Sequence, residues 1–151
     1  MFDAQRPLLD ALDSWAAIAG WFDGLVRLQE ERGCMGGCPL GSLASELADE
    51  DETARVALVG SFDAWEGYLE RGLERMRARG ELVARADPAT LAAATMASIQ
   101  GGLLLTQTCK NVRPLRVALD ATLAYLRTFA AAPTGQSAVA IADRGERAGP
   151  C

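Results

Sequence analysis

The sequence predicts an all-α fold, an antiparallel bundle of about five helices. Apolar residues recur every three or four positions through most of the chain, which is the period of an amphipathic helix. Glycine, proline and acidic capping residues separate these stretches, and no segment alternates apolar and polar residues as a strand does. Since the 151 residues are half hydrophobic, we expect one helical domain over residues 1–131 and a mobile tail over 132–151.

The first predicted helix runs from Pro7 to Arg32. It ends at "ERGCMGGC", where the glycines lower helix propensity. A short second helix follows Pro39, because proline suits a first turn in which the backbone N–H has no partner. The apolar positions that define these helices are Leu9, Leu12, Ala16, Ala19, Phe22 and Val26 in the first, and Leu40, Leu43 and Leu47 in the second.

The other three predicted helices have similar start signals. Asp51 is placed to cap a third helix over residues 52–79, and acidic groups are favoured at the positive N-terminal end of a helix. Asp87 precedes a proline and a fourth helix over residues 88–109. A fifth helix begins near residue 114 and continues to about residue 129.

The fourth predicted helix contains no charged residue over 22 positions, which is long enough to span a bilayer. However, threonine, serine and glutamine are frequent in it, and no aromatic residues flank its ends as they flank membrane spans. We therefore expect a helix that is packed on two sides within a protein, and no membrane contact.

Composition excludes several classes of function. The chain has no histidine, which removes the usual general base and the commonest transition-metal ligand. Its net charge of -5 has the wrong sign for a surface that neutralises phosphates, so nucleic-acid contact is not expected. The four cysteines do not form the paired C-x2-C spacing of zinc sites. We expect no metal, no cofactor and no enzymatic activity.

The cysteines at 34 and 38 raise two alternatives. They are four positions apart in a glycine-rich loop, so they are either small residues in a turn or a thiol pair that senses oxidants. The N-terminal residues "MFDAQRPLLDALD" lack the basic segment and apolar run of a secretion signal, so we expect a cytoplasmic protein. In that compartment a bond between Cys34 and Cys38 would be regulatory rather than structural.

Four segments together resemble the C-terminal domain of tetracycline-repressor-like (TetR) transcriptional regulators. The resemblance covers about residues 8 to 131. The segments are "GCPLGSLASELADED" after the first helix, "FDAWEGYLERGLERMRARGEL" at 62–82, "DPATLAAATMASIQGGLLLTQT" at 87–108 and "RPLRVALDATLAYL" at 113–126.

The resemblance implies an effector-binding and dimerisation domain. In that family an N-terminal helix-turn-helix domain reads operator DNA, and the C-terminal domain binds a small molecule and pairs with a second copy. Few residues precede the first predicted helix, so we expect no DNA-binding domain in this chain and no direct operator contact. The alternatives are an interaction protein that heterodimerises with full-length regulators, and a thiol-based redox sensor. A small helical enzyme ranks last, because the inward faces contain no paired carboxylates.

The two faces of the fourth predicted helix suggest two sites. One face is large and apolar and is expected to look toward the aromatic residues of the first and third helices, forming either a ligand pocket or a solid core. The expected ligand contacts are Trp21, Phe22, Phe62, Trp65, Met96, Ile99, Leu103 and Gln107, with Thr106, Asp63 and Glu66 as further polar groups.

The opposite face is formed by small residues, which let another helix approach closely. Because a glycine within a helix costs about 1 kcal/mol relative to alanine, the pair at 101 and 102 requires a packing reason. We expect this face to pair with the last helix of a second copy, in a four-helix arrangement about a two-fold axis; the alternative is an ordinary contact within one chain. The expected dimer residues are Ala97, Gly101, Leu104, Thr108, Leu119, Thr122 and Leu126.

Overall fold

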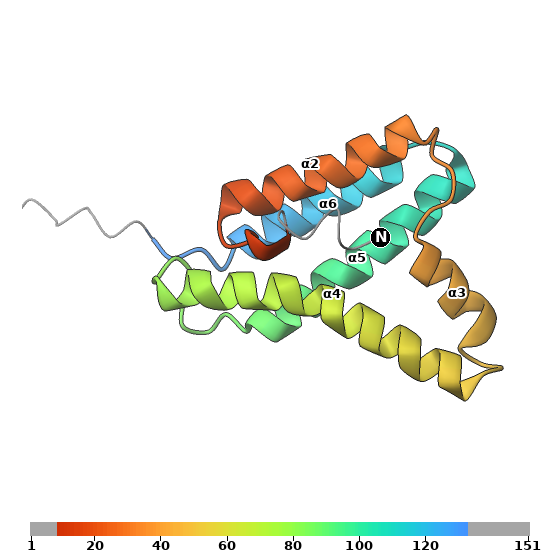
Figure 1. Ribbon diagram of the computed structural model, residues 1–151. Helices are drawn as coiled ribbons and strands as arrows, with labels where there is room; N and C mark the ends of the chain where they lie inside the picture. The colour runs from red at the N-terminus through yellow and green to blue at the C-terminus, as the bar shows by residue number, and fades with distance from the viewer. Residues whose placement is uncertain (1–8, 133–151) are drawn as a thin grey trace, which may run out of the picture.

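The computed structural model describes residues 9–132, and this part of the chain is all-α, which confirms the predicted fold class. Figure 1 shows α2 lying along α6 and α4 crossing the bundle. The short helix α3 lies at the edge of the bundle and connects α2 to α4. Between them, α5 packs on both α6 and α4. The helices are α2 (Trp15–Glu31), α3 (Pro39–Leu47), α4 (Glu52–Ala78), α5 (Pro88–Cys109) and α6 (Arg113–Arg127).

The predicted first helix, over residues 7–32, is wrong at its start. The helix α2 begins at Trp15, because Ser14 adopts an extended conformation and its hydroxyl accepts the N–H of Ala17 at 3.2 Å, which is an N-cap. Leu9 and Leu12 are buried, but they lie in a separate segment before this cap. Residues 7 and 8, where the helix was predicted to begin, lie outside the described residues.

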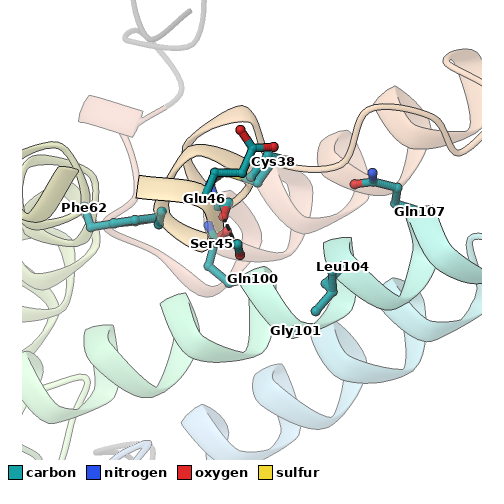
Figure 2. A pocket seen from close by; sticks show the side chains of 11 residues that line it. Cys38, Ser45, Glu46, Phe62, Gln100, Gly101, Leu104 and Gln107 are labelled. Carbon is teal, nitrogen blue, oxygen red and sulfur yellow. Dashed lines mark hydrogen bonds between the residues drawn. The ribbon is translucent and has the colours of Figure 1, made fainter. Parts of the chain in front are cut away.

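The loop between α2 and α3 reverses the chain through residues of left-handed backbone. Gly33, Gly36 and Gly37 have positive φ angles, and so does Cys34 at 57°. The N–H of Cys34 also donates to the carbonyl oxygen of Gln29 at 2.7 Å, which closes the end of α2. Figure 2 shows the α3 region that follows, with Gln100 of α5 pointing toward it.

The central helix α5 accounts for the uncharged segment of the sequence. Its inward positions Leu91, Thr95 and Ile99 are fully buried against the rest of the bundle. Among the described residues it is the helix that is long and apolar enough to cross a membrane by composition, and a core helix has the same composition. Because α4 and α6 both pack on it, a charge on its inward side would be desolvated without a partner.

The contact between α5 and α6 is close because Gly102 has no side chain. A Cβ atom at this position would stand 2.9 Å from Cδ1 and 3.1 Å from Cα of Leu115. Nearby, the buried hydroxyl of Thr106 accepts the N–H of Leu115 at 3.2 Å. Val112, the N-cap residue of α6, provides no side-chain cap, so α5 supplies one from outside the helix.

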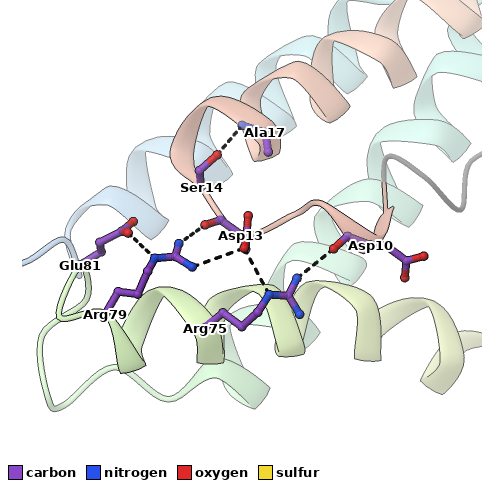
Figure 3. A network of polar contacts seen from close by, with 7 residues as sticks. All are labelled: Asp10, Asp13, Ser14, Ala17, Arg75, Arg79 and Glu81. Atoms are coloured by element: carbon purple, nitrogen blue, oxygen red, sulfur yellow. Dashed lines mark hydrogen bonds and ion pairs between the residues drawn. The ribbon is translucent and has the colours of Figure 1, made fainter.

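A polar clamp fixes the segment before α2 to the end of α4 (Figure 3). Arg75 donates to the carboxylate of Asp13 at 3.3 Å and to the carbonyl oxygen of Asp10 at 3.0 Å. Arg79 also binds the carboxylate of Asp13 at 3.3 Å, and it pairs with Glu81 at 2.6 Å. The segment therefore lies directly on α4.

Glycine is also required beneath this clamp. A Cβ atom on Gly72 would overlap the backbone carbonyl of Leu12. The side chain of Leu12 is buried beside it, so the segment packs by its backbone as well as by its leucine. This close approach explains why a helix of 27 residues carries a glycine at a fully packed position.

The segments that follow α4 and α6 are joined by backbone pairing. Leu82 and Ala130 form an antiparallel bridge, and the N–H of Val83 donates to the carbonyl oxygen of Phe129 at 2.9 Å. Residue 132 ends the described chain, so the predicted tail falls almost entirely outside the described residues.

We expect Gly72→Ala to lower the free energy of unfolding by about 1–3 kcal/mol, because the added methyl group meets backbone atoms that cannot rotate away. Gly60→Ala is the matched control on the same helix. Nothing lies within 4 Å of its Cβ position, so the helix propensity of alanine should stabilise the protein by about 1 kcal/mol. Urea unfolding of both variants measures the difference, and equal effects would contradict the close approach at Gly72.

Candidate functional site

A cavity of about 500 Å³ lies between α3, α4 and α5. Figure 2 shows Phe62 reaching it from α4, while Gln100, Gly101, Leu104 and Gln107 lie along α5 on its other side. Its volume is within the range of about 300–1,000 Å³ that is usual for small-molecule sites. The residues from α3 and its N-cap that line it are Cys38, Gly41, Ser42, Ala44, Ser45 and Glu46.

Two glycines, one in the loop before α3 and one within it, closely approach glutamine side chains of α5. A Cβ atom on Gly37 would overlap Oε1 of Gln107, and one on Gly41 would stand 2.9 Å from Oε1 of Gln100. The two glutamines are seven residues apart on α5, and therefore two turns apart on nearly the same face. Their carboxamides thus place polar groups along the cavity wall.

The N-terminus of α3 opens onto the cavity through Cys38. This residue is the N-cap, with φ of -97° and ψ of 115°, and its Sγ accepts the N–H of Gly41 at 3.5 Å. The side chain is buried and free of any disulfide. A thiol in this position takes the place of the serine or aspartate that usually caps a helix.

The charge of the lining restricts the ligands that fit. Glu46 is the acidic residue of the lining, and no basic residue among those described lines the cavity. The other polar groups are hydroxyls, carboxamides and one thiol. An anionic ligand would find no counter-charge here, so the cavity suits neutral or cationic molecules.

Only two of the expected ligand contacts, Phe62 and Gln107, line this cavity. The others lie in the core of the bundle, where the Trp21 ring contacts Phe22 at 5.5 Å and Trp65 at 6.4 Å between centroids. These aromatic residues therefore pack on one another in the core of the bundle. The expected contacts that are buried in the core are Trp21, Phe22, Trp65, Met96, Ile99 and Leu103.

The three further polar residues that were expected near the ligand lie outside the lining of the cavity. Thr106 is buried and caps α6, and Asp63 is exposed on α4. Glu66 is half-buried one turn after Phe62. Its burial raises the pKa of its carboxyl above the ordinary value of 4.5, and the negative charges of Asp63 and Glu70 raise it further.

The expected dimer residues also divide. On α5, Ala97 and Thr108 are exposed, whereas Gly101 and Leu104 are exposed and line the cavity. The expectation for α6 needs correction, because its three expected dimer residues are buried in the core of the same chain. Their exposed fractions are 2% for Leu119, 6% for Thr122 and 0% for Leu126.

A set of large apolar side chains that overlaps the expected one only at Leu104 is exposed on these two helices. Leu104 and Leu105 of α5 are 62% and 53% exposed, and Val117 of α6 is 56% exposed. Tyr125 lies farther along α6 and is also exposed, with its ring in edge contact with Phe129. This set, Leu104, Leu105, Val117 and Tyr125, is called the apolar face below.

The α3 lining was missed in the sequence, and one signal could have indicated it. The residues Ser42, Ala44 and Ser45 are small, and none of the nine residues of α3 is fully buried. A short helix with small side chains cannot fill the space beside a long one, so it leaves room for a ligand.

Comparison with known proteins gives one match. Residues 15–122 match the family model described as "Tetracyclin repressor-like, C-terminal domain". No curated protein and no solved structure matches the chain.

We expect Glu66→Gln to stabilise the protein at neutral pH, by up to about 1 kcal/mol. Because the pKa of Glu66 is higher in the folded than in the unfolded protein, the folded state binds this proton more tightly. Native stability therefore falls as pH rises from the ordinary glutamate pKa of 4.5 through the raised value, and it stays lower above that window.

The stabilising effect of Glu66→Gln should accordingly appear within this pH window, persist at neutral pH and vanish in more acidic solution. Thermal unfolding from pH 4 to pH 8 measures it, and Glu74→Gln, at an exposed position of the same helix, removes the same charge as a control. An equal gain from both substitutions, or a gain that does not depend on pH, would show that burial of Glu66 is not its cause.

Proposed function

Because the chain belongs to the family of tetracycline repressor-like C-terminal domains, we propose that it is the effector-sensing and dimerisation domain of a TetR-type transcriptional repressor. The family is regulatory and non-enzymatic. In this proposal the domain works in the cytoplasm, and operator DNA is read by a separate helix-turn-helix domain. Binding of a small molecule is the signal that the domain detects.

The cavity between α3, α4 and α5 carries the proposal. It combines apolar groups of Phe62 and Leu104 with carboxamides that can fix the orientation of a ligand, which is typical of small-molecule sites. The effector is an apolar or aromatic molecule that is neutral or cationic, since Glu46 would attract a cation and repel an anion.

Homodimerisation is proposed through the apolar face. Exposed leucine and valine side chains on two adjacent helices of one chain are unfavourable in water, and they are buried if a second copy covers them. Gly101 lies beside this face without a neighbour within 4 Å of its Cβ position, so the partner helix has room to approach.

We expect neutral and cationic polycyclic aromatic compounds to raise the melting temperature of the wild-type protein and to change its tryptophan fluorescence. At a ligand concentration of a hundred times the dissociation constant, the stabilisation should be about 2.7 kcal/mol. Sulfonated compounds of the same ring size should bind at least about tenfold more weakly, because the lining has no basic side chain.

Phe62→Ala should weaken binding by about tenfold or more, and Val59→Ala should not. Val59 lies one turn earlier on α4, is exposed and does not line the cavity. Circular dichroism of each variant confirms that it is folded. Equal affinities of the two variants, or preferential binding of the sulfonated compounds, would refute the proposed site.

For the dimer, we expect Leu105→Glu to convert the protein to a monomer in light scattering, because the carboxylate would be desolvated at the interface. Val56→Glu introduces the same charge at an exposed position of α4 and should leave the dimer intact. A wild-type monomer would contradict homodimerisation and favour a heterodimer with a longer regulator. Leu105 is used because Gly101 and Leu104 also line the cavity.

A further inference from the structure

The thiol of Cys38 and the carboxamide of Gln100 meet at one place in the cavity wall. The point at which a Cβ atom on Gly41 would stand is 2.9 Å from Oε1 of Gln100 and 4.0 Å from Sγ of Cys38. The thiol and the carboxamide therefore face the same small volume, from α3 and from α5 respectively, and both line the cavity.

The backbone at the start of α3 places an N–H donor on the sulfur of Cys38, which is the nucleophilic atom of this side chain. Its Sγ already accepts the N–H of Gly41, and it caps a helix of nine residues whose N-terminal end carries partial positive charge. The surrounding cavity also provides space for a reaction partner beside the sulfur.

The carboxamide of Gln100 has an unused donor. Its Nε2 is buried and has no hydrogen-bond partner within the part of the chain that the structure describes. A buried donor without a partner is unfavourable, so a ligand that supplies an acceptor is favoured at this place. A carbonyl oxygen is an acceptor of this kind.

We propose that the cavity takes apolar α,β-unsaturated carbonyl compounds and that Cys38 binds them covalently. The thiol loses its proton to water, and the sulfur lone pair forms a bond to the β-carbon of the ligand. The π electrons of the C=C bond shift toward the carbonyl oxygen, where Nε2 of Gln100 donates a hydrogen bond to the developing enolate. The α-carbon then takes a proton from water, so the net reaction adds the S–H group across the double bond without an oxidant. This inference rests on the proposed small-molecule site and names its ligand class.

The other described cysteines provide internal controls. Cys34 is also buried, but it does not line the cavity. Cys109 is exposed at the end of α5 and also lies outside the lining. The three thiols therefore differ in access to solvent and to the cavity, and a reagent that first binds in the cavity distinguishes them.

The probe is 4-phenyl-3-buten-2-one, a neutral aromatic enone, applied to the full chain with Cys151→Ser. Peptide mass spectrometry gives the modification rate of each cysteine over a range of probe concentrations. The rate at Cys38 should saturate with concentration, because the probe binds before it reacts, and the rate at Cys109 should rise linearly. Iodoacetamide, which has no apolar body, should modify Cys109 faster than Cys38. A linear rate at Cys38, or no adduct there, overturns the proposal.

Gln100→Leu tests the donor. The maximal rate at Cys38 should fall about 10- to 100-fold while the concentration for half-saturation stays within a factor of about three, since the amide acts on the developing enolate. An unchanged maximal rate would remove Gln100 from the reaction.

The saturated ketone 4-phenyl-2-butanone separates this inference from the proposed function. It should bind reversibly to the wild type and to Cys38→Ser, which keeps a capping side chain at this position. Reversible binding without an enone adduct overturns the covalent step and leaves the cavity as a ligand site. Failure of both compounds to bind overturns the covalent site and contradicts the small-molecule site beneath it.

Discussion

The close packing of α6 on α5 is the constraint on which the rest of the fold depends. Gly102 brings the two helices together, and the hydroxyl of Thr106 caps α6 from the neighbouring helix. The pair then presents one buried side to α2 and α4 and leaves the other side exposed. Both the core and the apolar face follow from this single arrangement, because the rotation of α5 decides which of its residues are buried.

The cavity exists because α3 is attached to this pair only lightly. Glutamine side chains of α5 approach the backbone closely at Gly37, just before α3, and at Gly41 within it. Apart from Glu46, the residues of α3 that border the cavity are small, so they leave open the space that Phe62 and Leu104 also border. The cavity adjoins the apolar face through Leu104, so the proposed surfaces for a ligand and for a second copy are continuous.

Capping residues and apolar periodicity predicted most of the helices, whereas the positions of the candidate sites depend on how the helices pack together. The caps at Asp51 and the proline at 88 mark real helix starts. The break at Ser14 was missed because the apolar spacing of Leu9 and Leu12 continues the period of α2, although these leucines pack from a separate segment. Periodicity identifies an apolar side of a helix, but it does not tell whether that side meets the same chain or a partner.

The same limit explains the errors in the sites. The leucine stripe of α6 was expected at a dimer seam, yet Leu119 and Leu126 are among the most buried side chains. The aromatic residues were expected around a ligand, yet Trp21 and Trp65 pack against each other. Large apolar groups fill space most efficiently, and the empty volume lies where the sequence is small and polar. Which residues of α3 border the cavity depends on the path of the loop before α3, and the periodicity of the sequence does not predict that path.

The contacts of Arg75 and Arg79 with the segment before α2 connect that segment, through α4, to the cavity. Phe62 borders the cavity and Arg75 holds the clamp, and they are separated along one rigid helix by about 20 Å. A tilt of about 3° at the cavity end is therefore a displacement of about 1 Å at the clamp. Asp13 and the backbone of Leu12 are in direct contact with the surface of this helix. The rigid helix α4 in this way connects the wall of the cavity to the segment that precedes α2.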